Sequence, residues 1–355
     1  MRVLVTGSAG FIGSAVCRAL ETEGHEVVRV DLMLPQAHGA AALPAGTHHH
    51  DVRDAESWTK LLDGVDAVCH QAALVGAGVR VSDLPMYAAH NDLGTAALLS
   101  AMYVAQVERV VLASSMVVYG EGRYSCADHG VQVPGLRRVT DLEAGNFDNR
   151  CPECGTALAW ELVDEDARLD PRSSYAASKV AQEHYASAWA RQAGGVVVAL
   201  RYHNVYGPGM PRDTPYSGVA AMFRSSLERG QPPQVFEDGR QMRDFVHVDD
   251  VARANVLALR AVVDEAGSRP GFAAYNVCSG HPIAIGDVAR LVAEGAAQPR
   301  EPEVTGGFRP GDVRHVVASP RRAADELGFR AAIAPDEGLP AFATAPLRGP
   351  ASPAG

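Results

Sequence analysis

The chain has 355 residues, enough to bury a sizeable core as one large domain or two moderate ones, and its 47% hydrophobic and 21% charged residues are typical of a globular protein. The formal net charge of −10 argues against nucleic acid as the main partner, because no basic stripe is available to neutralise phosphates. No apolar run approaches the length of a membrane span, and the start of the chain lacks the long apolar region of a signal peptide. We therefore expect a soluble, cytoplasmic protein with no membrane or nucleic-acid partner.

A glycine-rich loop follows the first predicted strand. Residues 2–6 form a short apolar segment, which leads into the pattern G-x-x-G-x-x-G and then into a helical run to about residue 20. Glycines at this spacing let the backbone turn tightly and approach a pyrophosphate, which binds the free N–H groups at the start of the helix. The loop residues that we expect to bind a dinucleotide are Gly7, Gly10, Phe11, Ile12 and Gly13.

The second predicted strand, residues 26–30, ends in Asp31. An acidic residue about twenty positions beyond the loop accepts hydrogen bonds from the adenosine ribose and repels a 2′-phosphate. A glycine loop alone is weak evidence, but strand, loop, helix, strand and terminal acid occur here in order. The pattern therefore predicts NAD rather than NADP.

Strands and helices continue to alternate along the first 200 residues. The predicted strands are 46–50, 66–70, 109–113 and 196–200, and the predicted helices are 54–62, 85–104 and 174–191. Such alternation predicts an α/β fold, a Rossmann-type doubly wound parallel sheet covered on both faces, whose ligands bind at the carboxyl ends of the strands. Three groups of residues follow strands there and are expected to line one cleft: Gln71 with Ala72 and Ala73, Ser114 with Ser115, and residues 201–204.

Tyr175 and Lys179 stand four residues apart in a predicted helix, so their side chains lie on one face, one turn from each other. An ammonium beside a phenol lowers the pKa of the phenol and makes it a useful base. For an isolated Y-x-x-x-K, an accidental surface pair is the better interpretation. The motifs elsewhere in the chain favour a functional pair.

A long connection, residues 121–170, contains two short metal-ligand patterns. These are Cys126-x-x-His129 and Cys151-x-x-Cys154-Gly. Together they supply four ligands of the types that structural zinc takes, and such a closed site would clamp a long loop beside the active site. A redox pair and unliganded thiols are the alternatives. The other three cysteines lie in strand or helix patterns and are expected to be core residues.

Taken in order, the motifs T-G-S-A-G-F-I-G, D-V-R, H-Q-A-A, S-S-M-V-V-Y-G, Y-x-x-x-K, L-R-Y-H-N-V-Y-G-P-G and R-D-F-V-H-V-D-D resemble the extended short-chain dehydrogenase/reductases, and within them the NAD-dependent nucleotide-sugar epimerases and dehydratases. The resemblance covers residues 1 to about 329. It implies that Tyr175, Lys179 and Ser115 are catalytic, with Lys179 also holding the nicotinamide ribose. The further residues that it places at or near the cofactor are Asp51, Val52, Ala72, Ala73, Asn91 and Ser114, although a buried core role for Asn91 is equally open.

The second half, residues 201–333, is predicted to be a smaller α/β domain that binds the substrate, with a helix at 215–229 and a hairpin over 235–250 around the turn at residues 237–239. The resemblance implies that Arg243 and Arg309 bind the pyrophosphate of a nucleoside diphosphate-sugar and that Asn204 contacts the phosphate–sugar region. Surface ion pairs are the alternative for the arginines. Phe236 lies against the base or at the edge of the core. The tail, residues 334–355, is rich in Ala, Pro and Gly, which predicts disorder.

The residues after Ser115 limit the reactions that the site can catalyse. Related dehydratases carry an Asp–Glu pair there, whereas this chain has Met116 and Val117, which cannot transfer protons. The resemblance therefore implies a 4-epimerase that keeps NAD tightly bound and passes through a 4-keto sugar. The leading substrate is a dTDP-6-deoxyhexose such as dTDP-L-rhamnose, with UDP-hexoses and UDP-hexuronates open. A nucleotide-sugar reductase, dehydrogenase or dehydratase and a non-catalytic NAD-binding protein are the alternatives. Family members commonly dimerise through the helices at 85–104 and 174–191, so a homodimer is expected.

Overall fold

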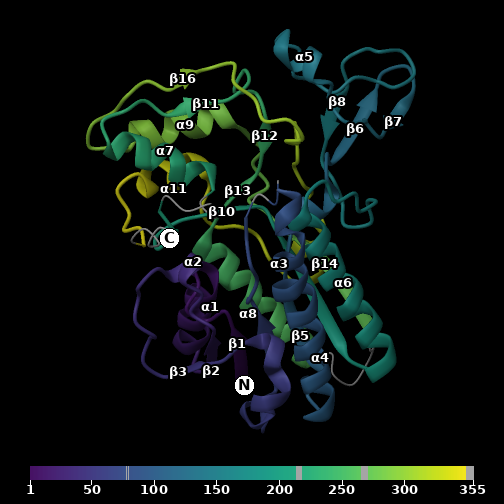
Figure 1. Ribbon diagram of the computed structural model, residues 1–355, viewed down its shortest axis with the longest axis vertical. Helices are drawn as coiled ribbons and strands as arrows, with labels where there is room; N and C mark the ends of the chain where they lie inside the picture. Colours follow the sequence, from purple (N-terminus) through teal and green to yellow (C-terminus); the bar gives the residue numbers. More distant parts are fainter. Residues whose placement is uncertain (77, 79, 213–217, 265–270, 349–355) are drawn as a thin grey trace.

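A computed structural model describes residues 1–76, 78, 80–212, 218–264 and 271–348. At its centre is a sheet of seven parallel strands in the order β14-β9-β5-β4-β1-β2-β3, in the lower half of Figure 1. The strands are β1 (Arg2–Thr6), β2 (Glu26–Asp31), β3 (Thr47–His49), β4 (Ala67–His70), β5 (Arg109–Ser115), β9 (Val196–Tyr202) and β14 (Gly271–Val277). The Rossmann-type sheet predicted from the alternating pattern is therefore confirmed.

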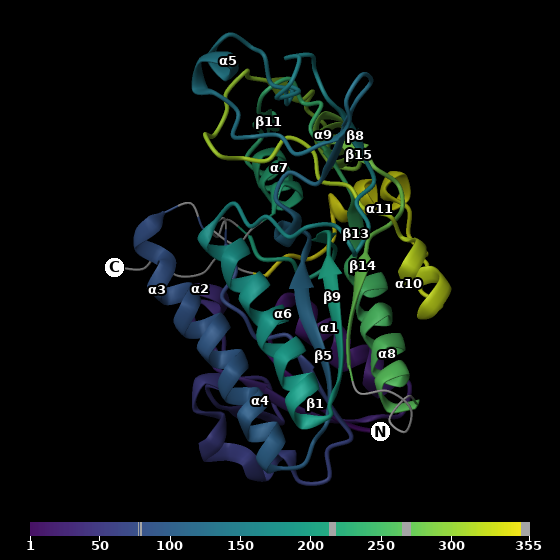
Figure 2. The ribbon, with the colours of Figure 1, turned by 90° about the vertical axis from the view of Figure 1, so that its right-hand side faces the viewer.

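Helices cover both faces of this sheet because successive side chains along each strand point to opposite faces. Val3 and Val5 of β1 pack into a core with α1 (Phe11–Thr22) and α8 (Val248–Asp264), whereas Leu4 packs into a second core on the other face. Figure 2 shows α4 and α6 on the side of β5 and β9 opposite α1 and α8. The helices of the second face are η1 (Val52–Leu62), α4 (Gly94–Val104) and α6 (Ser174–Ala193).

Several short elements connect these layers. The segments α3 (Leu84–Tyr87), η3 (Ala88–Leu93) and α4 follow one another directly and form the long helical run that the sequence predicts. The other connecting elements are α2 (Pro35–His38), η2 (Val81–Asp83) and η4 (Met116–Tyr119). Within the described ranges, no helix combines the length and apolar character needed to cross a lipid bilayer.

The residues after β9 form most of a second lobe, the upper part of Figure 1, but α8 and β14 return to the central sheet. The lobe has its own core between α7, α9 and α11. Its elements are β10 (Asn204–Tyr206), α7 (Val219–Glu228), β11 (Gln234–Val235), β12 (Met242–Arg243), β13 (Phe245–His247), β15 (Ile283–Ala284), α9 (Ile285–Glu294), β16 (Glu303–Val304) and α11 (Pro335–Phe342). The remaining helix, α10 (Arg321–Glu326), packs against β14 of the central sheet.

The long connection between β5 and α6 builds a separate antiparallel sheet in the order β7-β6-β8. A small core of Tyr124, Cys126, Cys151 and Leu158 lies beneath it. The elements are β6 (Arg123–Cys126), β7 (Gly130–Gln132), α5 (Val139–Glu143) and β8 (Ala159–Glu161). The name "insertion" is used below for residues 121–170.

Two predictions for the second half were wrong. The segments on either side of Gly239 do not form a hairpin, because β11 pairs with β16 and β12 pairs with β15. The tail is ordered as far as residue 348: α11 begins at a proline and buries Leu339 and Phe342, three residues apart, against α9. The Ala- and Pro-rich composition of the tail made this short apolar face of α11 difficult to recognise in the sequence. The predicted helix at 215–229 begins at Val219 in the described part of the chain, and residues 213–217 and 349–355 lie outside it.

Candidate active site

A cavity of about 380 Å³ lies at the carboxyl ends of β1, β2, β4, β5 and β9. It collects most of the residues that the sequence assigned to cofactor and catalysis. Those that line it are Gly7, Gly10, Phe11, Ile12, Gly13, Asp31, Asp51, Val52, Ala72, Ala73, Ser114, Ser115, Tyr175, Lys179 and Asn204. Asn91, Phe236, Arg243 and Arg309 are not part of its lining.

The glycine loop leaves the start of α1 free to bind an anion. A Cβ on Gly13 would lie 2.0 Å from the carbonyl oxygen of Gly7, so only glycine permits this close approach of backbone to backbone. Gly7 itself has a φ of 64°, in the left-handed region that favours glycine. Gly10 caps α1 without a side-chain hydrogen bond, which leaves N–H groups of the first turn available.

Asp31 lies at the end of β2 with its carboxylate held in place. Its Oδ2 accepts from the Ala9 amide at 2.9 Å and its Oδ1 accepts from the Met33 amide at 2.7 Å. Nε2 of His38, which the sequence analysis did not select, lies 3.3 Å from Oδ1. Burial alone would raise the pKa of Asp31, but the hydrogen bonds from His38, Met33 and Ala9 hold that pKa below its usual value. The ionised carboxylate retains acceptor capacity for ribose hydroxyls.

The predicted catalytic residues meet at the start of α6, whose N-cap Ser173 accepts from the Ala176 amide. Nζ of Lys179 donates to the Ala113 carbonyl at 2.9 Å and lies 5.9 Å from the centre of the Tyr175 ring. Burial raises the pKa of Tyr175 above its ordinary value, and hydrogen bonding with Ser115 opposes this. Burial is thus the largest effect on this pKa in the chain without a bound cofactor.

A buried ion pair, absent from the sequence predictions, supports the catalytic residues. Glu183 follows Lys179 by one further helical turn, and both of its carboxylate oxygens accept from Arg201, at 2.9 and 2.7 Å. Glu183 also accepts from Ser114 Oγ at 2.5 Å. Burial lowers the pKa of Lys179 to about 7, and the charge of Glu183 opposes that change. The sequence signal was present, because Y-x-x-x-K-x-x-x-E places all three on one helix face.

His203 belongs to the segment 201–204 that the sequence placed at the cleft, but no role was predicted for it. It lines the cavity, is 4% exposed, and neither ring nitrogen has a hydrogen-bond partner within the described residues. Burial lowers its pKa to about 3, so the ring is neutral, with one donor and one acceptor. Oδ1 of Asn204 is likewise buried and unpartnered among the residues described. Buried polar groups without partners are rare, so both side chains indicate a polar ligand.

The four predicted residues outside the cavity lining have other contacts. Asn91 is fully buried and joins the loop after β4 to α6, because its Nδ2 donates to Leu74 O and to Ser178 Oγ. Arg243 donates to the backbone carbonyls of residues 242, 313 and 314. The Arg309 guanidinium lies 5.2 Å from the centre of the Phe236 ring. Neither arginine is in an ion pair among the described residues, so the surface ion pairs considered as alternatives are absent there.

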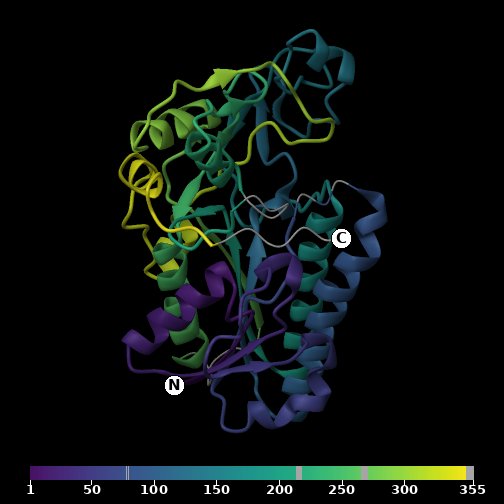
Figure 3. The same cartoon turned by 60° about the vertical axis from the view of Figure 1, so that its left-hand side comes forward.

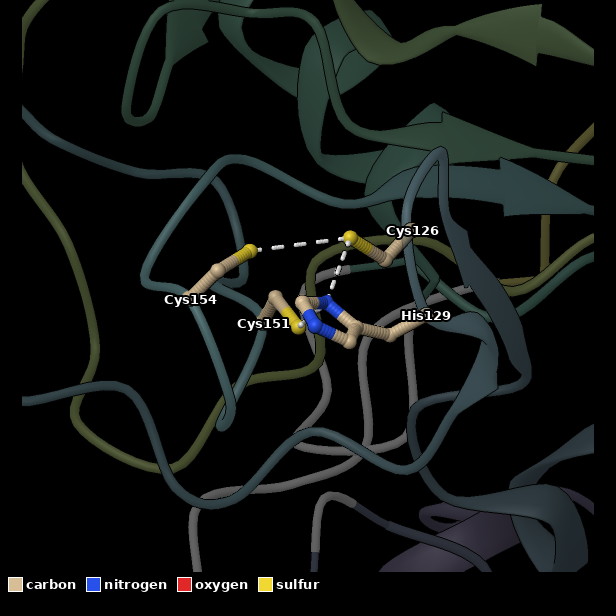
Figure 4. Close-up of side chains that lie close together, drawn as sticks. All are labelled: Cys126, His129, Cys151 and Cys154. Atoms are coloured by element: carbon tan, nitrogen blue, oxygen red, sulfur yellow. Dashed lines mark hydrogen bonds between the residues drawn. The ribbon is translucent and has the colours of Figure 1, made fainter.

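The insertion brings its two predicted ligand pairs together (Figure 4). The four ligand atoms of Cys126, His129, Cys151 and Cys154 all lie within 4.8 Å of one another. The Sγ atom of Cys126 is 3.5 Å from His129 Nδ1 and 3.7 Å from the Sγ of Cys154. Tetrahedral zinc with sulfur and nitrogen ligands separates them by about 3.4–3.8 Å, and both distances from Cys126 fall in that range.

Comparison with known proteins identifies the family. The profile of the NAD dependent epimerase/dehydratase family matches residues 3–132 and 155–278. The chain belongs to this family, which confirms the family predicted from its motifs. The unmatched residues 133–154 lie within the insertion and contain Cys151 and Cys154.

Individual relatives and solved structures are similar to this chain over nearly its whole length. The dTDP-L-rhamnose 4-epimerase of Burkholderia thailandensis is 35% identical over 341 residues, which cover 93% of this chain and 90% of that protein. The structure of MoeE5 in complex with UDP-glucuronic acid and NAD matches with a TM-score of 0.73 at 32% identity, covering 96% of this chain and 97% of the other. The UDP-glucose 4-epimerase of Thermus thermophilus, in complex with NAD, matches with a TM-score of 0.73 at 31% identity, covering 97% and 98% of the two chains.

Proposed function

We propose that this protein is an NAD-dependent nucleotide-sugar 4-epimerase, with dTDP-L-rhamnose as its leading substrate. The observation that carries the proposal is the single cavity that joins the glycine loop and Asp31 to Tyr175, Lys179 and Ser115. The similarity to the Burkholderia thailandensis enzyme supports both the reaction and the sugar.

The lining of the cavity fits NAD. The first turn of α1 would take the pyrophosphate, Asp31 the adenosine ribose, and Lys179 the nicotinamide ribose. The unpartnered atoms of His203 and Asn204 in the described part of the chain are suited to polar groups of the cofactor or the sugar. When bound, NAD supplies a reversible hydride acceptor for C4 of the sugar.

The protein's own residues transfer one proton, that of the sugar 4-hydroxyl. The positive nicotinamide of bound NAD and the Lys179 ammonium would favour the phenolate of Tyr175 against the effect of burial. As phenolate, Tyr175 removes the proton from the sugar 4-hydroxyl as C4 is oxidised, while Ser115 hydrogen-bonds the same oxygen. After the 4-keto sugar turns in the cavity, C4 is reduced on its other face, and Tyr175 returns the proton to the oxygen. The proton and the hydride both return to the sugar, so no net oxidation occurs. Met116 and Val117 offer no group for the further proton transfers that a dehydratase makes.

The experiment that tests this proposal is incubation of the purified protein with dTDP-, UDP- and GDP-sugars and no added cofactor, followed by NMR. We expect inversion at C4, seen in the H4 coupling constants, with dTDP-L-rhamnose converted fastest. A parallel incubation with added NADH tests the alternative: steady consumption of NADH with one sugar, and no C4 inversion with any of them, would support a reductase instead. Binding of NAD without conversion of any sugar would support a non-catalytic protein.

Zinc bound by Cys126, His129, Cys151 and Cys154 is the second part of the proposal. All four positions are filled by protein ligands, so the ion is structural rather than catalytic. The insertion docks on the second lobe through the buried carboxylate of Glu121, which accepts from Asn149 Nδ2 and from the Arg314 amide. Zinc would thus stabilise the insertion and, through Glu121, its contact with the segment after Arg309, to which Arg314 belongs.

Replacement of Cys151 by serine is expected to remove the metal. Protein purified without chelator or metal-affinity resin should contain about one zinc per chain, and Cys151→Ser about none, with a lower melting temperature because the insertion has only a small core. Elemental analysis and thermal unfolding measure the two effects. Cys17→Ala is the matched control, since it removes a buried thiol outside the cluster. Zinc-free wild-type protein would overturn this assignment.

We also propose a homodimer in which α3–η3–α4 and α6 pack against the same helices of a second copy. Leu93, at the junction of η3 and α4, is 55% exposed, and Tyr185 of α6 is 48% exposed. Exposed apolar residues on neighbouring helices favour a protein contact there. Light scattering of the purified protein gives the oligomeric state, and a monomer at micromolar concentration would contradict this arrangement.

A further inference from the structure

The C-terminal segment after α11 returns to the cofactor cavity. The Gly209 amide donates to Pro346 O at 2.7 Å, and the Arg348 amide donates to Met210 O at 3.1 Å. Figure 3 shows this yellow segment running between the upper lobe and the purple N-terminal elements. Because α11 is packed into the core of the upper lobe, the segment begins from a fixed position.

The side chain of Arg348 reaches the glycine loop. Its guanidinium donates to Ala9 O at 2.5 Å, to Gly10 O at 2.8 Å and to Ser14 Oγ at 3.0 Å. These three acceptors surround the first turn of α1, and Arg348 itself lines the cavity. A residue 339 positions away in sequence from Ala9 therefore contributes to the cofactor site.

The charge of Arg348 has no counter-ion in the described part of the chain. Its hydrogen-bond acceptors are all neutral, and no described carboxylate lies within salt-bridge distance of it. Burial lowers its pKa, while Asp31 acts on it only through a longer-range attraction. The N-terminus of α1 adds a partial positive charge of about half a unit at the same place. Two positive groups held together in a cavity favour an anion between them.

We propose that Arg348 is a cofactor-binding residue that neutralises the pyrophosphate of NAD together with the N–H groups of α1. This inference rests on the proposed binding of NAD and adds a residue to that site. An Arg fork suits phosphate oxygens, and its position on the C-terminal segment ties retention of the cofactor to the docking of that segment. The segment thereby keeps NAD bound from one turnover to the next.

The test compares Arg348→Ala with Arg348→Lys and with Arg321→Ala, a control whose side chain is 86% exposed. Protein freed of NAD is titrated calorimetrically with NAD, ADP and adenosine. For Arg348→Ala we expect dissociation constants for NAD and ADP to rise by roughly tenfold to a hundredfold, as for loss of a hydrogen bond to a charged group. Adenosine, which carries no phosphate, should bind unchanged. Arg348→Lys should be intermediate, because it keeps the charge but loses the planar fork.

Two results would overturn the inference. One is that Arg348→Ala binds NAD as tightly as Arg321→Ala; the other is that it loses affinity for adenosine by the same factor as for ADP, which indicates a purely structural contact. Thermal unfolding shows whether the variant is folded, and a chain ending at Leu347 compared with one ending at Gly349 gives a second readout. If the wild-type protein itself bound no NAD, the proposed function would fail, rather than this inference alone.

Discussion

Replacing Tyr175 by phenylalanine should lower kcat for epimerisation by about 10²–10⁴-fold, the usual contribution of a positioned acid–base group. The ring would still fill its place beside Tyr87, whose ring centre lies 5.8 Å away, but no atom would remain to take the 4-hydroxyl proton. The measurement is kcat together with the NAD content of the purified variant, which we expect to be unchanged.

Tyr185→Phe is the matched control for this substitution, because Tyr185 lies on the same helix, is 48% exposed and is not part of the cavity lining. It should retain the activity of the wild type. If Tyr175→Phe converted the sugar at the wild-type rate, Tyr175 would not be the base. If it lost NAD as well, the role of Tyr175 would be to hold the cofactor site together.

Glu183→Gln should reduce the free energy of unfolding by about 3–5 kcal/mol, because removing one partner of a buried ion pair leaves the other charge uncompensated. The side chains of Arg201 and Glu183 are 5% and 2% exposed, and the glutamate also receives the Ser114 hydroxyl. Denaturant unfolding monitored by circular dichroism measures the change.

The control is Glu294→Gln, which breaks a pair with Arg290 in which the arginine and glutamate side chains are 51% and 53% exposed. An exposed pair contributes about 1 kcal/mol or less, so this variant should unfold almost as the wild type does. Equal stability of Glu183→Gln and Glu294→Gln would mean that the Arg201 charge is compensated by other groups near the end of β9.

Local patterns in the sequence were sufficient to predict the parallel sheet and the glycine-rich loop. The strands that end at Thr6, Asp31 and Ser115 are short and apolar, and glycine and acidic residues follow them at positions that parallel topology brings to one edge. The cluster of three cysteines and one histidine was predicted in the same way, because each pair lies within one tight turn. The structure places the two pairs next to each other, although Cys126 and Cys154 are 28 residues apart in the sequence.

The missed features depend on contacts between distant segments. Arg348 reaches Ala9 only because α11 is docked, and the sequence around α11 has the composition of a disordered tail. The wrong hairpin has a similar cause: the turn before Gly239 is real, since its amide donates to Phe236 O, but each flanking strand pairs with a strand much further along the chain. Pairing between short strands is decided by tertiary packing rather than by the turn.

The most direct test of the central claim uses dTDP-L-rhamnose labelled with deuterium at C4, incubated with the wild-type protein in ordinary water without added cofactor. The account predicts that the C4-inverted product keeps its deuterium, because the hydride leaves C4 and returns to it within one cavity. Loss of the deuterium to water, or conversion that requires stoichiometric NADH, would contradict a 4-epimerase that works by hydride transfer and return.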